Sequence, residues 1–218
     1  MLLATEPYLA QKARWPREGR HILAQYDATS IIVYQAFRPD IVRSAVAHGH
    51  FAEGFSLSRM SWIKPNFLWM MFRSGWAQKQ DQEAIVAVRL HRAAFDEALA
   101  AAVHSAFVRE IHGTEAPWKS AVASSDVRLQ WDPDHDPGGN KVERRAIQIG
   151  LRGATLARYA GAWIIGVEDV TDFVREQRAH ASAGDHERLL LPREEVYPVA
   201  DAAVAAKLAV SDSRGQER

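Results

Sequence analysis

The stretch that decides the fold is residues 59–76, RMSWIKPNFLWMMFRSGW. Its first part, RMSWIK, predicts a short strand, and Pro65 ends that strand because proline has no N–H to donate to a neighbouring strand. Pro65 also suits the first turn of a helix, and Gly75 suits the position just after one. The stretch therefore predicts a strand over 59–64 that turns directly into a helix over 65–75.

Outward from this stretch, strand and helix patterns alternate without a strict βαβ period. Runs rich in β-branched and aromatic residues predict strands at 30–37, 84–91, 126–131, 144–151 and 162–170. Helical patterns cover 40–49, 92–113 (with a break near His104), 153–159 and 171–181. We therefore expect an α+β fold, a single domain with a mixed, mostly antiparallel sheet flanked by helices.

The chain has 218 residues, which is the size of one large domain. We expect residues 1–19 to be an irregular N-terminal lead-in and residues 20–199 to form the globular domain. The last segment, 200–218, is polar and rich in alanine, so a peripheral helix or a loose tail is expected there.

Composition excludes several classes of function. The 27 Lys and Arg residues equal the 27 Asp and Glu residues, which argues against a partner held by bulk charge, such as nucleic acid in general or an anionic membrane. The absence of cysteine excludes disulfides, thiolate metal sites and a cysteine nucleophile. No signal peptide and no apolar run long enough to span a bilayer is evident, so a cytoplasmic protein without a membrane partner is expected.

No metal is predicted. Histidine spacings typical of zinc enzymes are absent. The acidic string WDPDHDPGGNKVE imitates a calcium loop, but Pro137 stands where that loop needs a glycine. The simpler interpretation of the string is an acidic surface turn.

Basic and aromatic residues around Pro65 predict a ligand site. Lys64 precedes the expected helix N-terminus, where free N–H groups favour a phosphate or a carboxylate. Asn66, either Trp69 or Met70, and Arg73 share one helix face by their spacing. Aromatic rings beside an anion site suit a nucleotide or another anionic aromatic ligand. The alternative is that the aromatic residues are simply core. The candidate binding residues are Arg59, Trp62, Lys64, Asn66, Trp69 and Arg73.

Four strings in this order, YDATSIIVYQAF, RMSWIKPNFLWMMFRSGW, VRLQWDP and IQIGL, resemble the family catalogued as domain of unknown function 4291 (DUF4291). The resemblance extends from about Arg20 to Tyr197. More distantly, the order of elements resembles the ADP-ribosyltransferase superfamily. That second resemblance implies NAD as the cofactor and cleavage of its N-glycosidic bond.

The superfamily resemblance also implies roles for individual residues. Tyr34 stands on the first strand, where the superfamily usually has His or Arg. Gln148 takes the place of a late glutamate and would hold a ribose hydroxyl, while Asp132 is a candidate to act on the acceptor. Gln148 instead of Glu favours an acceptor other than a protein side chain, such as nucleic acid. The candidate catalytic residues are therefore Tyr34, Asp132 and Gln148.

Three hypotheses follow, and each makes a structural prediction. A nucleotide-using transferase needs an open pocket at the strand–Pro65–helix junction. A non-catalytic RNA-binding module needs a continuous basic stripe through Arg59, Arg73, Arg128 and Arg145. A purely structural role predicts that Arg59, Lys64 and Arg73 are each paired with an internal carboxylate and that no pocket is open.

Overall fold

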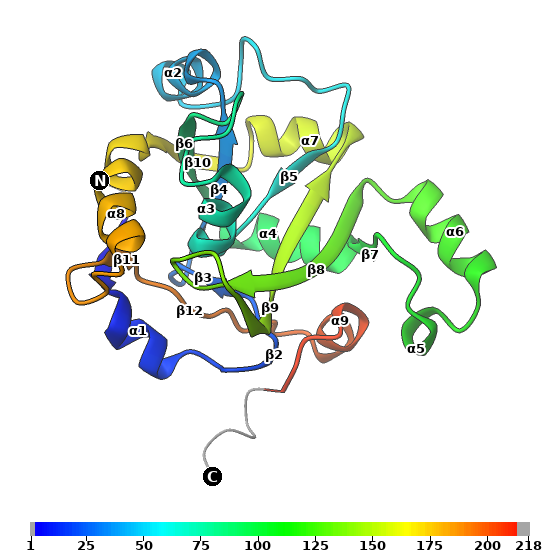
Figure 1. The fold of residues 1–218 in the computed structure, drawn as a ribbon. Helices are drawn as coiled ribbons and strands as arrows, with labels where there is room; N and C mark the ends of the chain where they lie inside the picture. The colour runs from blue at the N-terminus through cyan, green and yellow to red at the C-terminus, as the bar shows by residue number, and fades with distance from the viewer. Residues whose placement is uncertain (1–2, 213–218) are drawn as a thin grey trace.

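A computed structural model describes residues 3–212 (Figure 1). The strands are β1 (Thr5–Pro7), β2 (Gly19–Arg20), β3 (Leu23–Ala24), β4 (Ser30–Phe37), β5 (Ser61–Ile63), β6 (Ala84–His91), β7 (Val103–His104), β8 (Val127–His135), β9 (Lys141–Leu151), β10 (Ile164–Asp169), β11 (Leu190–Pro192) and β12 (Glu195–Val196). The helices are α1 (Tyr8–Arg14), α2 (Pro39–His48), α3 (Phe67–Ser74), α4 (Arg92–Ala101), α5 (Arg109–His112), α6 (Glu115–Ser124), α7 (Gly153–Ala160), α8 (Thr171–Ala183) and α9 (Ala202–Leu208).

Two larger sheets organise the described residues, beside the two-stranded sheets β1-β11 and β12-β3. One is antiparallel, in the order β10-β6-β4, and the other has the order β2-β9-β8-β7 with β5 also paired to β9. In the second sheet only the β2–β9 and β7–β8 pairs are parallel. The expected α+β fold with mixed, mostly antiparallel pairing is confirmed, although the strands divide among several sheets rather than one.

The two sheets meet just after β5. The Tyr34 N–H of β4 donates to the Lys64 carbonyl over 2.7 Å, and the Lys64 N–H donates to the Tyr34 carbonyl over 3.2 Å. This isolated bridge holds Lys64 between the sheets, because β5 itself is bonded to β9 in the second sheet.

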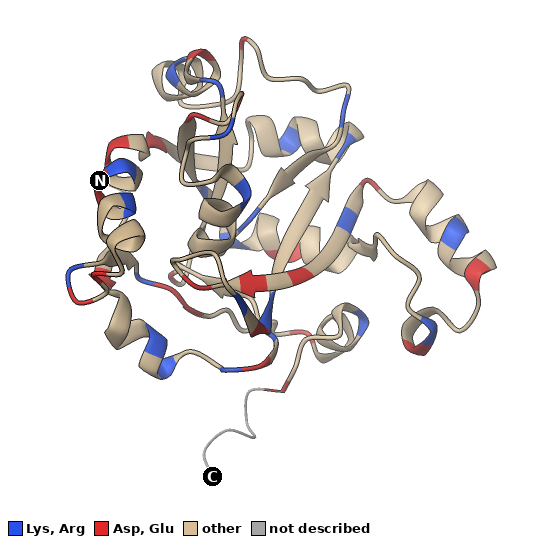
Figure 2. Cartoon of the chain, viewed as in Figure 1, with Lys and Arg blue, Asp and Glu red and all other residues tan. Residues whose placement is uncertain are grey.

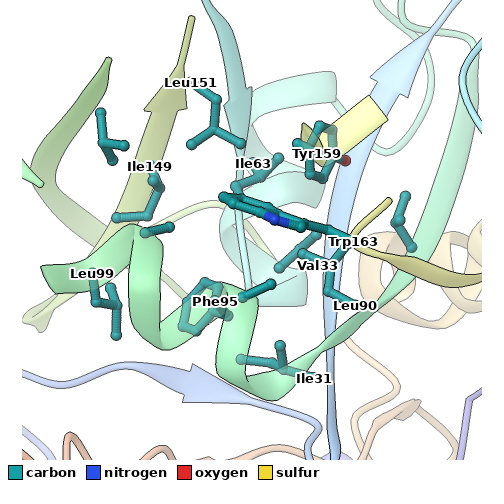
Figure 3. Packing of buried hydrophobic residues seen from close by; sticks show 14 of the residues in the cluster. Ile31, Val33, Ile63, Leu90, Phe95, Leu99, Ile149, Leu151, Tyr159 and Trp163 are labelled. Carbon is teal, nitrogen blue, oxygen red and sulfur yellow. The ribbon is translucent and has the colours of Figure 1, made fainter. Parts of the chain in front are cut away.

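Both faces of β4 are buried, which accounts for its nearly continuous apolar sequence. Ile31 and Val33 belong to a cluster between the two sheets and α4, with Phe95 of α4 and Ile149 of β9 (Figure 3). Ile32 and Tyr34 belong to a second cluster, with residues of α3 and α8. Successive strand residues face opposite sides, so neighbours on β4 enter different cores.

The N-terminal segment is not the irregular lead-in expected for residues 1–19. It contains β1, which pairs with β11, and α1, whose Gln11 is fully buried. Gln11 Nε2 donates to the Leu191 carbonyl over 3.3 Å, and the Trp15 indole N–H donates to the Glu194 carbonyl over 2.9 Å. These contacts with Leu191 and Glu194, which lie far away in the sequence, fix the position of α1.

At the C-terminal end, the expected peripheral helix over 200–218 is present as α9, which Asp201 caps. Residues 213–218 of that prediction lie outside the described part of the chain. The break expected near His104 is also present, because α4 ends at Ala101 and β7 follows. The loop expected after Trp131 is shorter than predicted, since β8 continues to His135.

The distribution of charged residues over the fold agrees with the balanced composition. Basic and acidic residues are intermixed over the elements (Figure 2). Within residues 3–212, no helix is both long and apolar enough to cross a membrane.

Candidate functional site

A cavity of about 340 Å³ opens where the end of β4, β5, α3 and β9 come together. Its walls combine predicted site residues with several that the sequence did not single out. The lining residues are Gln35, Ala36, Phe37, Arg59, Met60, Ser61, Trp62, Lys64, Met70, Arg73, Asp81, Gln82 and Gln148. The strand–Pro65–helix junction therefore borders an open pocket, as the transferase hypothesis requires.

Lys64 is the most unusual of these side chains, because it is only 4% exposed. Within the described residues, its ammonium group makes no hydrogen bond or ion pair. Burial and the nearby Arg73 guanidinium lower the pKa of Lys64 to about 8, and the Asp132 carboxylate opposes this shift. A buried charge without an internal partner favours an anionic ligand.

Two arginines accompany this lysine at the pocket. Arg59 and Arg73 line the cavity and are exposed. Neither forms an ion pair with an acidic residue in the part of the chain that the structure describes. Asp81 is the acidic residue among the lining residues, so cations outnumber it. The pairing of Arg59, Lys64 and Arg73 with internal carboxylates, which a purely structural role predicts, is not found.

Gln148 is fixed by its neighbours on β8. Its side-chain amide donates from Nε2 to Asp132 Oδ2 over 2.7 Å, and Gln130 Nε2 donates to Asp132 Oδ1 over the same distance. The side-chain oxygen of Gln148, Oε1, accepts no hydrogen bond within the described residues, so it is left as an acceptor for a ligand hydroxyl. Asp132 is not among the lining residues, and its contacts position Gln148 instead.

A family model described as a domain of unknown function, DUF4291, matches residues 21–197. The chain belongs to the DUF4291 family. The search of curated proteins found no match. All the residues that line the pocket fall within the matched region.

Tyr34 does not lie at the pocket of this DUF4291 protein. Its ring is fully buried against Phe67, with centroids 5.4 Å apart, and burial raises its pKa well above the usual range. Because β4 side chains alternate, the pocket receives Gln35 instead. Gln35 Nε2 donates to Ser61 Oγ over 2.8 Å, and the Tyr159 hydroxyl donates to Gln35 Oε1 over 2.7 Å. The candidate catalytic residue Tyr34 therefore does not line this pocket, whereas Gln35 does and joins β4, β5 and α7.

The expected anion site at the N-terminus of α3 is filled by the protein itself. Asn66 caps the helix by accepting from the Trp69 N–H over 2.7 Å. The buried Glu194 carboxylate accepts from the Phe67 N–H over 2.6 Å and from Asn66 Nδ2 over 3.1 Å. Burial raises the pKa of Glu194 well above its usual range, and the two donors oppose that shift. Asn66 is therefore an internal cap and does not line the pocket.

Trp69 also lies away from this cavity. Its ring stacks on Phe72 and His135, with centroids 5.5 and 5.4 Å away. Trp69 is 6% exposed, so the alternative that the aromatic residues belong to the core holds for this residue. Trp62, in contrast, is half-buried and lines the pocket.

The basic stripe of the RNA-binding hypothesis is not continuous. Arg128 is buried, and its guanidinium donates to the carbonyls of Ser125, over 2.8 Å, and Val122. Arg128 pairs with Gly150 and Arg145 pairs with Pro133 across β8 and β9. Positions 145 and 150 have opposite parity on β9, so the two arginines face opposite sides of the sheet.

The described residues contain no group of three or more His, Cys, Asp or Glu side chains that could hold a metal ion. In the acidic string, Asp134 forms a buried ion pair with Arg144, at 2.5 Å. Asp136 accepts from the Asn140 N–H over 2.9 Å in the β8–β9 turn. Both carboxylates are therefore engaged within the protein.

Gly150 makes room for the Trp62 wall of the pocket. A Cβ atom at this position would lie 2.6 Å from Met60 Sδ and 3.1 Å from the Trp62 ring. We predict that Gly150→Ala lowers the free energy of unfolding by about 1–2 kcal/mol, because the Met60 side chain must shift and the Trp62 ring must also give way. Urea unfolding measures the effect. Gly161→Ala is the matched control, since a Cβ there meets nothing within 4 Å, and equal effects of the two variants would contradict the prediction.

Proposed function

We propose that this DUF4291 protein is a nucleotide-using transferase that binds NAD at the β4–β5–α3–β9 pocket and transfers ADP-ribose to an acceptor. The observation that carries the proposal is the largely buried Lys64, whose ammonium group makes no hydrogen bond or ion pair within residues 3–212, beside two arginines that also form no ion pair there. Such a set of cations suits the phosphates of a nucleotide. The distant resemblance to ADP-ribosyltransferases supplies the choice of NAD among nucleotides.

Each wall of the pocket has a role in this proposal. Lys64, Arg59 and Arg73 bind the pyrophosphate. Trp62 packs on a flat ring, as aromatic side chains do beside nucleotide bases. The Gln148 carbonyl accepts a hydrogen bond from a ribose hydroxyl. A cavity of about 340 Å³ is at the lower end of ligand-site volumes, so the nicotinamide half is enclosed and the adenosine half extends over the rim.

The reaction breaks the bond between the ribose C1′ and the nicotinamide nitrogen, and nicotinamide leaves with the bonding electrons. A nucleophilic atom of the acceptor forms the new bond to C1′ and loses its proton to solvent. Positive charge develops on the ribose in between. The Gln148 carbonyl dipole, held by Asp132, stabilises that charge in place. Asp132 is thus a positioning residue, and nucleic acid is the acceptor class that the resemblance favours.

Titration calorimetry with NAD, together with nicotinamide release from labelled NAD, tests the proposal. We expect Lys64→Met to weaken NAD binding about 10- to 100-fold, the effect of losing a charge-assisted hydrogen bond. Arg43→Gln, an exposed position on α2, is the control and is expected to bind as the wild type does.

Two results would overturn the proposal: wild-type protein that neither binds NAD nor releases nicotinamide, or a Lys64→Met variant with unchanged affinity. Salt-dependent binding of single-stranded RNA in the absence of NAD binding would favour the RNA-binding alternative.

A further inference from the structure

A second cavity, of about 460 Å³, lies on the other side of α3. It is enclosed by α1 and the residues that follow it, by Leu68 of α3, and by the ends of β8 and β9. None of its lining residues lines the first pocket. Its α1 wall precedes residue 21, so it is built partly from outside the region that the family model matches.

The floor of this second cavity is apolar and aromatic. Tyr8, Trp15 and Leu68 are buried there, and Tyr8 packs edge-on against Trp15 with centroids 6.3 Å apart. Burial raises the pKa of Tyr8 to about 12. The Tyr8 hydroxyl therefore stays protonated at neutral pH and can donate a hydrogen bond.

His135 gives an independent sign that a ligand belongs here. It lines the cavity, is 2% exposed, and neither ring nitrogen has a hydrogen-bond partner in the described residues. Its ring lies flat on Phe72, with centroids 3.5 Å apart and planes within 9°. Buried polar atoms normally have partners, so a ring held rigidly with two unsatisfied nitrogens is suited to a ligand.

The rim of the second cavity is cationic. Lys12 and Arg17 are exposed there, and neither forms an ion pair within residues 3–212. The Asp136 carboxylate also lines the cavity. It accepts hydrogen bonds from the Asn140 backbone N–H, over 2.9 Å, and from the Asn140 side-chain amide, over 3.0 Å. Arg144 is likewise engaged, with Asp134. With Arg144 paired to Asp134, the two cations Lys12 and Arg17 outnumber the one remaining lining carboxylate, Asp136.

We propose that the second cavity binds a small carboxylic acid with an apolar body. The body packs on Tyr8, Trp15 and Leu68 and reaches His135, and the carboxylate lies between Lys12 and Arg17. A volume of about 460 Å³ accommodates a ligand of this size. The proposal is independent of NAD binding, because the two cavities share no residue.

Naphthalene-2-carboxylate is the probe, and its neutral carboxamide is the matched comparison. Calorimetry is expected to give one site per chain, with the carboxylate about three- to tenfold tighter than the carboxamide, as expected for contacts with two exposed cations. The double variant Lys12→Gln/Arg17→Gln is expected to remove that preference. Arg43→Gln is expected to retain it.

Nitrogen-15 NMR of the histidine side chains locates the probe, with His135→Phe used to assign the resonances. The His135 signals are expected to shift on binding, and Lys64→Met is expected to leave the affinity unchanged. Equal affinities for carboxylate and carboxamide, unmoved His135 signals, or loss of binding in Lys64→Met would each overturn the proposal.

Discussion

Replacing Glu194 with alanine is expected to lower the free energy of unfolding by about 2–4 kcal/mol. The change leaves two buried donors, the Phe67 N–H and Asn66 Nδ2, without their acceptor. Each buried unsatisfied donor costs about 1–3 kcal/mol, and relief of the buried carboxyl group offsets part of the sum. Chemical denaturation by urea, followed by tryptophan fluorescence, measures the change.

The adjacent Glu195 gives a matched control. It is exposed and pairs with Arg193 at 2.8 Å, so Glu195→Ala is expected to cost less than about 1 kcal/mol. Glu194→Gln is expected to fall between the two alanine variants, because the amide keeps one acceptor oxygen but brings an NH₂ group to Asn66. If Glu194→Ala proved as mild as Glu195→Ala, the carboxylate would not be holding the start of α3.

Glu194→Ala is expected to affect the two cavities through α3. Its side chains Met70 and Arg73 line the first pocket, while Leu68 lines the second. A loosened N-terminal turn of α3 is therefore expected to weaken ligand binding at both cavities, even though Glu194 lines neither.

The fold around residues 59–76 was predictable because its signals are local. Pro65 and Gly75 act through their own backbone geometry, and α3 does end at Gly75, with φ 59°. The helix starts later than predicted, at Phe67, because Asn66 takes the capping position. Lys64, Arg59 and Arg73, which were predicted from their place in that segment, line the first pocket.

The parts that escaped prediction depend on contacts far apart in the chain. Glu194 is 128 residues from Asn66, and nothing in its local sequence marks it as a helix cap. Gln35 was obscured because both faces of β4 are buried, so alternation could not decide between it and Tyr34. The lead-in was misjudged because α1 is only seven residues long and owes its position to the segment around Leu191 and Glu194.

The Lys64→Met variant is expected to be more stable than the wild type, by about 1–3 kcal/mol at pH 7. Methionine has a similar shape and no charge, so the variant removes the ammonium group of a side chain that is only 4% exposed and forms no hydrogen bond or ion pair in the described part of the chain. Most buried substitutions destabilise, which makes a gain here diagnostic. Lys119→Met, on exposed α6, is the control and is expected to change stability by less than about 1 kcal/mol.

The pH dependence of this difference has a definite sign. The pKa of Lys64 is about 8 in the folded protein, against 10.5 for an unperturbed lysine. Below pH 8 Lys64 is protonated in both the folded and the unfolded wild type. The difference in the free energy of unfolding between Lys64→Met and the wild type is therefore constant there. Between about pH 8 and 10.5 the folded wild type releases its proton before the unfolded chain does, so its stability rises relative to the variant. If the difference in the free energy of unfolding did not change across this pH range, the Lys64 charge would not be destabilising the folded protein.

Lys64→Met is thus expected to raise the free energy of unfolding and to lower the affinity for NAD. A structural lysine would lose stability on replacement and leave NAD affinity untouched. A lysine kept for an anionic ligand would gain stability and lose affinity, since its charge is compensated only when the ligand is bound. Thermal unfolding of both proteins with and without NAD separates the cases, because at one NAD concentration the melting temperature is expected to rise more for the wild type than for Lys64→Met.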